Sequence, residues 1–142
     1  MANNALSVAA KNVAGSGSMI SNVVDKIASP EVNVSDIERS RRFYERYLGF
    51  EAEASPREDG VLMLHDGSGF SLALGLSDEP ISVPSFLHFG AGLASPEDVR
   101  AFRGRVVSDG VEVVGWWDEP DYVSVKFRDP DGYVVEVSWE PA

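Results

Sequence analysis

The chain has 142 residues, of which 44% are hydrophobic, enough for one core. Its 12 Lys and Arg against 23 Asp and Glu give a net charge of −11, which disfavours nucleic acid and anionic membranes as partners. No stretch reaches the roughly 18 apolar residues of a membrane span. Cysteine is absent, which excludes disulfides, thiolate metal sites and cysteine nucleophiles. We therefore expect a cytoplasmic protein that binds a small molecule.

Residues 1–22 are predicted to be a flexible or helical appendage, because they include the linker-like run Gly15-Ser16-Gly17-Ser18. Residues 23–142 are predicted to form a single domain.

The first half of this domain has the pattern of one strand, one helix and three strands. Polar and apolar residues alternate over 31–34, and a helical pattern follows a cap at Ser35 or Asp36. Gly49 is predicted to end that helix. Strand patterns follow at 50–54, 61–65 and 70–75.

The second half repeats the order. An apolar run at 86–93 precedes a helix that opens at Ser95-Pro96 and stops at Gly110. Three further strands are predicted at 111–114, 122–127 and 133–139. Equivalent positions in the two helices, such as Phe43 and Phe102, are 59 residues apart in the sequence. Equivalent positions near the end of each repeat, such as Asp66 and Asp129, are 63 residues apart. The domain is thus predicted to contain two repeats, at about 27–82 and 85–140.

Two motifs carry a family resemblance. The opening motif runs from Val34 through Leu48-Gly49-Phe50, and the closing motif is Phe127-Arg128-Asp129-Pro130-Asp131-Gly132-Tyr133 followed by Glu136. Together they resemble the vicinal oxygen chelate superfamily of glyoxalases, bleomycin-resistance proteins and extradiol dioxygenases. The resemblance implies an α+β fold of two tandem βαβββ modules that form a curved, cup-like mixed sheet with the helices outside. It also implies a small-molecule ligand and frequent homodimers, and it implies no organic cofactor.

The resemblance further implies a divalent metal in the cup, held by the first and last strands of each repeat. Carried over by register, the four ligand positions are Ser29, Ala73, His88 and Glu136. Only His88 and Glu136 are strong ligands, which predicts weak or absent metal binding, because tight sites use at least three protein ligands. Strand alternation places Glu31 beside Ser29, so Glu31 is a possible substitute ligand.

His88 and Glu136 are the main candidate catalytic residues. Glu136 lies among Val134, Val135 and Val137, and a buried carboxylate must find partners. We expect Glu136 to act as a base on a proton beside a carbonyl, with His88 or a metal polarising the enolate and Glu31 as a ligand or second base. The plainer interpretation is that His88 is a hydrogen-bonded core histidine. The other histidine, His65, precedes a turn and is predicted to be exposed.

The candidate substrate-binding residues are Ser29, Asn33, Ala73, Trp116 and Trp117. The adjacent tryptophans are predicted to lie in a loop, one facing inward and one outward, where an aromatic ring can stack on a ligand or pack at an interface. Two functions stay open. One is a glyoxalase-like or dioxygenase-like enzyme; the other is a bleomycin-resistance-type protein that sequesters a small molecule without catalysis, for which net charge favours a cationic ligand.

Overall fold

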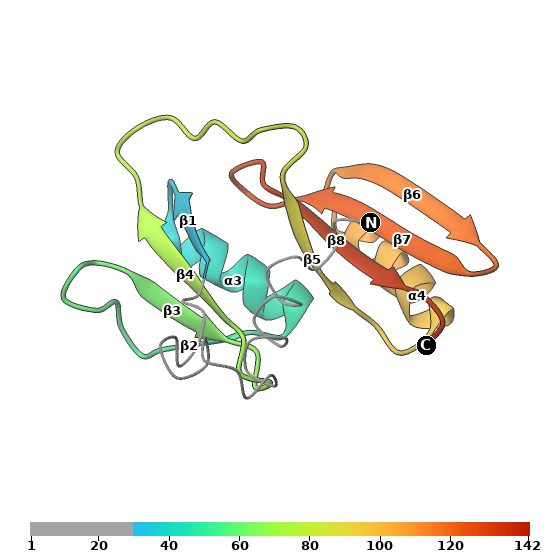
Figure 1. Ribbon diagram of the computed structural model, residues 1–142. Coiled ribbons are helices and arrows are strands. Elements are labelled where there is room, and N and C mark those ends of the chain that lie inside the picture. Colours follow the sequence, from blue (N-terminus) through green and yellow to red (C-terminus); the bar gives the residue numbers. More distant parts are fainter. Residues whose placement is uncertain (1–29) are drawn as a thin grey trace, which may run out of the picture. The chain divides into compact units, whose positions relative to one another are not determined.

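The computed structural model describes residues 30–142, so the predicted appendage at 1–22 and the candidate residue Ser29 lie outside the described residues. The described chain divides into two compact units, residues 30–81 and Ser82–Ala142, which we call the first and second modules (Figure 1). No helix in the described part of the chain is long and apolar enough to cross a membrane.

The first module is a four-stranded mixed sheet with one helix. Strand β1 runs parallel to β4, β4 and β2 each run antiparallel to β3, and the strand order is β1-β4-β3-β2. Its elements are β1 (Glu31–Val34), α3 (Ile37–Leu48), β2 (Glu51–Ala52), β3 (Leu62–His65) and β4 (Ser71–Leu76).

Helix α3 begins and ends at the predicted residues. The Asp36 carboxylate accepts a hydrogen bond from the backbone N–H of Arg39 at 2.9 Å, which caps the first turn. Gly49 ends the helix in the left-handed region, with a φ of 67°. Tyr44 and Tyr47 are buried on the inner face of the helix, and the Tyr44 ring makes an edge contact with Phe50. Burial of these large rings supplies much of the module's apolar core.

The second module repeats this arrangement. Its strand order is β5-β8-β7-β6, with β5 parallel to β8 and the other pairs antiparallel. Its elements are β5 (His88–Gly92), α4 (Pro96–Ser108), β6 (Val113–Glu119), β7 (Tyr122–Arg128) and β8 (Val134–Trp139). The α+β fold of two βαβββ modules is therefore confirmed.

Helix α4 packs on one face of the second sheet. Ser95 caps its first turn by accepting from the N–H of Asp98 at 3.1 Å, and Pro96 occupies the first helical position, as predicted. Phe102 contacts the ring of Phe127 on β7 at 5.4 Å between centroids. Because Phe127 faces α4, every second side chain of β7, beginning with the neighbour of Phe127, points to the sheet face opposite the helix.

The two Asp-x-x-Gly turns adopt the same structure. Asp66 accepts from the N–H of Phe70 at 3.1 Å, and Asp129 accepts from the N–H of Tyr133 at 2.8 Å. In each pair the backbone N–H of the aspartate bonds back to the carbonyl of the same partner residue. The equivalent Gly69 and Gly132 both have positive φ angles. The internal repeat therefore extends to individual hydrogen bonds.

The prediction of a strand at 111–114 followed by a loop with both tryptophans was wrong. Strand β6 begins at Val113 and continues through Trp116 and Trp117 to Glu119. A register shift between Val113 and Gly115 marks a bulge, after which β6 pairs with β7 without a break as far as Tyr122. Tryptophan favours extended strands, and pairing with β7 extends β6 to Glu119, so the turn contains only Pro120 and Asp121.

Candidate functional site

The face of the second sheet opposite α4 gathers several polar side chains, and we call it the polar face. Val123, Val125 and Phe127 of β7 are fully buried toward the helix. The intervening residues of β7 and their register partners on β8 therefore point to the opposite side. This polar face carries His88, Tyr122, Ser124, Lys126 and Glu136.

Glu136 lies on the inner strand β8 and is only 1% exposed. Its Oε1 atom accepts hydrogen bonds from the Tyr122 hydroxyl and from the Ser124 hydroxyl, each at 2.5 Å. Tyr122 and Ser124 therefore fix the Glu136 carboxylate while leaving its second oxygen free of hydroxyl partners.

His88, on the edge strand β5, faces that second oxygen. Its Nε2 atom lies 3.3 Å from Glu136 Oε2, and its side chain is 12% exposed. Both atoms are buried, and their approach is within ion-pair range without the alignment of a hydrogen bond. The Nδ1 atom lies 3.4 Å from the Phe86 carbonyl. The structure thus brings together the two main candidate residues, and each retains capacity for a further polar partner.

Gly90 allows this close approach. It is the register partner of Glu136, and a Cβ at Gly90 would collide with the backbone carbonyl of Glu136. Only a residue without a side chain fits between the two strands at this point.

Tyr122 and Ser124 were missed in the sequence analysis. Both are common surface residues, and neither belongs to the closing motif. A signal was present nevertheless, because Ser124 lies between Val123 and Val125 and is therefore one residue out of phase with the apolar face of the strand. Pairing of β7 with β8 then places Ser124 within reach of Glu136.

The two tryptophans face opposite sides of β6. Arg103 of α4 lies over the Trp116 ring at 4.8 Å, so Trp116 packs on the helix side. Trp117 is on the polar face, is 43% exposed and lies under the ammonium of Lys126 at 5.0 Å from the ring centroid. Roles of Trp117 and Trp116 in substrate binding stay predictions, and only Trp117 is on the polar face.

The remaining candidates lie in the first module. Glu31 and Asn33 are exposed and alternate with the buried Val32 and Val34, as predicted. Glu31 is the register partner of Ala73, and its Oε1 atom lies over Gly75. A site composed of Glu31, His88 and Glu136, and ligand contacts by Asn33 and Ala73, stay predictions.

His65 is 45% exposed, as predicted. Its Nδ1 atom lies 2.8 Å from the Ser71 hydroxyl and its Nε2 atom 3.3 Å from Glu53 Oε1. This surface arrangement makes His65 a suitable control for His88, because both imidazoles lie near a glutamate.

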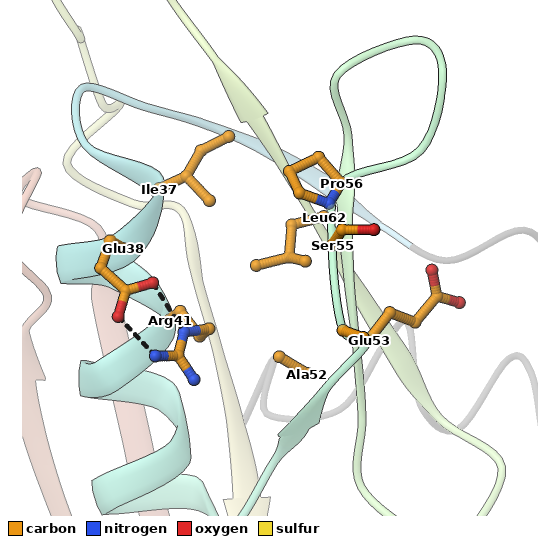
Figure 2. A pocket seen from close by; sticks show the side chains of 9 residues that line it. Ile37, Glu38, Arg41, Ala52, Glu53, Ser55, Pro56 and Leu62 are labelled. Carbon is orange, nitrogen blue, oxygen red and sulfur yellow. Dashed lines mark hydrogen bonds and ion pairs between the residues drawn. The ribbon is translucent and has the colours of Figure 1, made fainter.

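A pocket of about 450 Å³ lies in the first module between α3 and the segment around β2 (Figure 2). Its charged residues are already paired: Arg41 binds Glu38 and Glu45, and Glu53 binds Arg57 at 2.8 Å. The Arg41 guanidinium lowers the pKa of Glu38, and the Arg57 guanidinium lowers the pKa of Glu53. These ion pairs leave no unpaired acid or base for catalysis among the pocket's lining residues.

The donor set does not fit a tight metal site. Over residues 30–142 no group of three or more His, Asp or Glu side chains is arranged to hold a metal ion. His88 Nε2 and Glu136 Oε2 are two donors, whereas protein metal sites normally use three or four. The alanine at position 73 provides no side-chain donor.

Residues 25–137 match the family model of the Glyoxalase/Bleomycin resistance protein/Dioxygenase superfamily. The chain belongs to this superfamily. The assignment confirms the resemblance carried by the opening and closing motifs, and the matched range extends over both modules as far as residue 137.

One curated relative is an enzyme. The trivalent organoarsenical cleaving enzyme of Bacillus sp. (strain MD1) is 30% identical over 86 residues, which are 61% of this chain and 52% of that enzyme. The superfamily member described here thus spans about half the length of the curated relative that it matches.

Solved structures share the fold. An integron cassette protein from the metagenome of the Halifax Harbour sewage outfall is 25% identical, with a TM-score of 0.64 over 80% of this chain and 97% of that one. The fosfomycin resistance protein FosX of Listeria monocytogenes, solved with Mn(II) and 1S,2S-dihydroxypropylphosphonic acid, is 15% identical, with a TM-score of 0.71 over 83% and 94% of the two chains. At 15% identity the likeness to FosX shows a common fold alone.

Proposed function

We propose that this superfamily member is a small-molecule enzyme whose second module moves a proton beside a carbonyl group. The observation that carries the proposal is the buried contact between His88 Nε2 and Glu136 Oε2 at 3.3 Å. An acid and a base held side by side, away from water, are what such proton transfer requires. The enzymatic activity of the curated relative also favours catalysis.

The contacts of each residue suggest its role. Glu136 Oε1 is occupied by the hydroxyls of Tyr122 and Ser124, so Oε2 is the oxygen available to take a proton from the substrate carbon. His88 Nε2 lies beside it and can donate its N–H to the enolate oxygen that develops. Burial strengthens both interactions, because the surroundings have a low dielectric constant. No step needs a metal, and Glu31 stays a second candidate base.

Deuterium exchange tests the proposal. The purified protein is incubated in D₂O with pyruvate and with neutral ketones, and loss of the proton signal beside the carbonyl is followed by NMR. We expect Glu136→Gln and His88→Ala each to slow exchange about 100-fold or more, the scale of general acid–base catalysis. His65→Ala is the matched control and should exchange at the wild-type rate. Deuterium exchange at the wild-type rate in the Glu136→Gln variant would contradict the proposal.

Sequestration without catalysis is the second candidate function, and the small number of metal donors favours it. A sequestering protein would bind a ligand with saturable stoichiometry, and binding would raise its Tm while no proton exchanged. Homodimerisation and a cytoplasmic location stay predictions, and neither function depends on them.

A further inference from the structure

Lys126 lies opposite Glu136 of the proposed proton-transfer pair. It is the register partner of Glu136 across the antiparallel strands β7 and β8, and both side chains are on the polar face. Side chains at such positions have Cβ atoms about 5 Å apart. The Lys126 ammonium is therefore within the length of a small substrate from the Glu136 carboxylate.

Lys126 has no carboxylate partner in the part of the chain that the structure describes. Its contact is with Trp117, whose ring centroid lies 5.0 Å from the ammonium nitrogen. Arg128, two residues further along the same strand, is engaged differently: its guanidinium lies 3.3 Å from Glu112 and donates to the Gly132 carbonyl at 3.0 Å. In a chain with 23 acidic residues, an unpaired cation next to a candidate site indicates a ligand of opposite charge.

Gly115 creates the space that holds Trp117 in place. It is opposite Lys126 in the β6–β7 register, next to the bulge. A Cβ at Gly115 would lie 2.6 Å from the Cζ3 and Cη2 atoms of Trp117, so the indole lies over the bare backbone of this glycine. The ring is thereby kept under the Lys126 ammonium, where a cation–π contact restrains the flexible lysine.

We infer that Lys126, held by Trp117, binds an anionic group of the substrate on which His88 and Glu136 act. The inference rests on the proposed function and names its substrate class: a small carbonyl compound that carries a carboxylate, such as a 2-oxo acid. The negative charge of this substrate is opposite to the cationic ligand that the net charge of −11 suggests. The charges next to the site determine which ligand binds, because exposed charges more than about 8 Å from it are largely screened at physiological salt.

Pyruvate and its neutral analogue 2,3-butanedione form the test, with Kd measured by NMR titration of the full chain. We expect Lys126→Met to weaken pyruvate binding about tenfold or more and to leave butanedione binding unchanged. Lys126→Arg keeps the charge and should retain most of the affinity. Arg128→Met removes a cation from the same strand and should leave both affinities at the wild-type level.

Gly115→Ala tests the role of Trp117 without changing any charge. The added methyl displaces the indole from beneath the ammonium, and we expect pyruvate binding to weaken about threefold to tenfold, since a loose lysine must be ordered on binding. Circular dichroism establishes that each variant is folded, and Lys126→Gln replaces Lys126→Met if the latter is not.

Three results would overturn the inference: no binding of pyruvate by the wild-type protein, equal pyruvate affinity in Lys126→Met, or equal loss of affinity for butanedione. Binding is measured without turnover, so the two proposals fail separately. Lys126-dependent binding without deuterium exchange would remove the enzyme function and leave the anion site. Deuterium exchange at the wild-type rate in Lys126→Met, with unchanged pyruvate affinity, would remove the anion site and leave the enzyme function.

Discussion

The two modules share one scaffold and differ at the position where chemistry is expected. In each module an acidic residue faces a small residue across the parallel strand pair: Glu31 faces Ala73 in the first, and Glu136 faces Gly90 in the second. The acid is on the edge strand β1 in the first module and on the inner strand β8 in the second. Glu31 is consequently exposed, whereas Glu136 is buried and bound by two hydroxyls.

This difference in strand position shows how two modules of one fold can bury an acidic residue in one copy and expose it in the other. An edge strand leaves its acid in water, where a carboxylate needs no partner. An inner strand surrounds the acid with neighbours on both sides, and these must satisfy it. The repeat therefore determines where side chains point, and the identity of the residue on β8 determines whether a reactive group is buried there.

The largest effect is expected from Gly90→Ala. The new Cβ would collide with the backbone carbonyl of Glu136, which cannot move without disrupting β8, and we expect a loss of about 3 kcal/mol in the free energy of unfolding. The matched change is Gly75→Ala, whose Cβ would meet the flexible end of Glu31 and should cost under about 1 kcal/mol. Urea unfolding measures both, and equal losses would contradict the difference between the modules.

A smaller effect separates the two equivalent turns. Asp129 is buried and caps the N–H groups of Asp131 and Tyr133, so Asp129→Ala should cost about 2 kcal/mol because two donors lose their acceptor. Asp66 is more accessible to water, and Asp66→Ala should cost only about 1 kcal/mol. Urea unfolding measures both variants, and a larger loss of unfolding free energy in Asp66→Ala than in Asp129→Ala would contradict this prediction.

The Asp66 turn should also weaken in acid. Burial alone would raise the pKa of Asp66, but hydrogen bonds from the Ser68 hydroxyl and from the N–H groups of Ser68 and Phe70 outweigh it and lower the pKa. A lowered folded-state pKa stabilises the protein above the unfolded pKa of about 4, and this stability is lost as pH falls through the folded value. Asp66→Asn should therefore show a shallower loss of stability below about pH 4 than the wild type. Parallel acid unfolding curves for the two proteins would contradict this assignment.

The smallest effect concerns the helices. Gly104 of α4 is equivalent by the repeat to Glu45 of α3, and a Cβ at Gly104 would meet no atom within 4 Å. Gly104→Ala should stabilise the second module by about 0.5–1 kcal/mol, because alanine loses less backbone entropy in a helix. A thermal scan measures the rise in Tm, and a fall would indicate that α4 needs the glycine.

The fold could be predicted from the sequence because its signals are local. Asp36, Gly49 and Ser95 act within one turn of their own helix, and the Asp-x-x-Gly turns close on themselves. The alternation of Glu31 and Asn33 with valines likewise needs no distant partner. The path of β6 was missed because its pairing with β7 and its bulge depend on residues further along the chain.

The candidate site could be predicted only in part. His88 and Glu136 stand at positions fixed by the repeat, so their approach follows from strand register. The hydroxyls of Tyr122 and Ser124 reach Glu136 from β7, and Lys126 is opposite Glu136 on the same strand. The register of β7 with β8 is set by tertiary pairing. Residues that act through such pairing have no motif of their own, and composition alone does not distinguish them from surface residues.

The most direct test of the account is the ¹⁵N NMR spectrum of the two histidines in the wild type and in Glu136→Gln. If His88 Nε2 faces the Glu136 carboxylate, removing that charge should shift the His88 ring nitrogens clearly while those of His65 stay unchanged. An unchanged His88 spectrum would contradict the contact, and the proposed proton transfer would lose its basis.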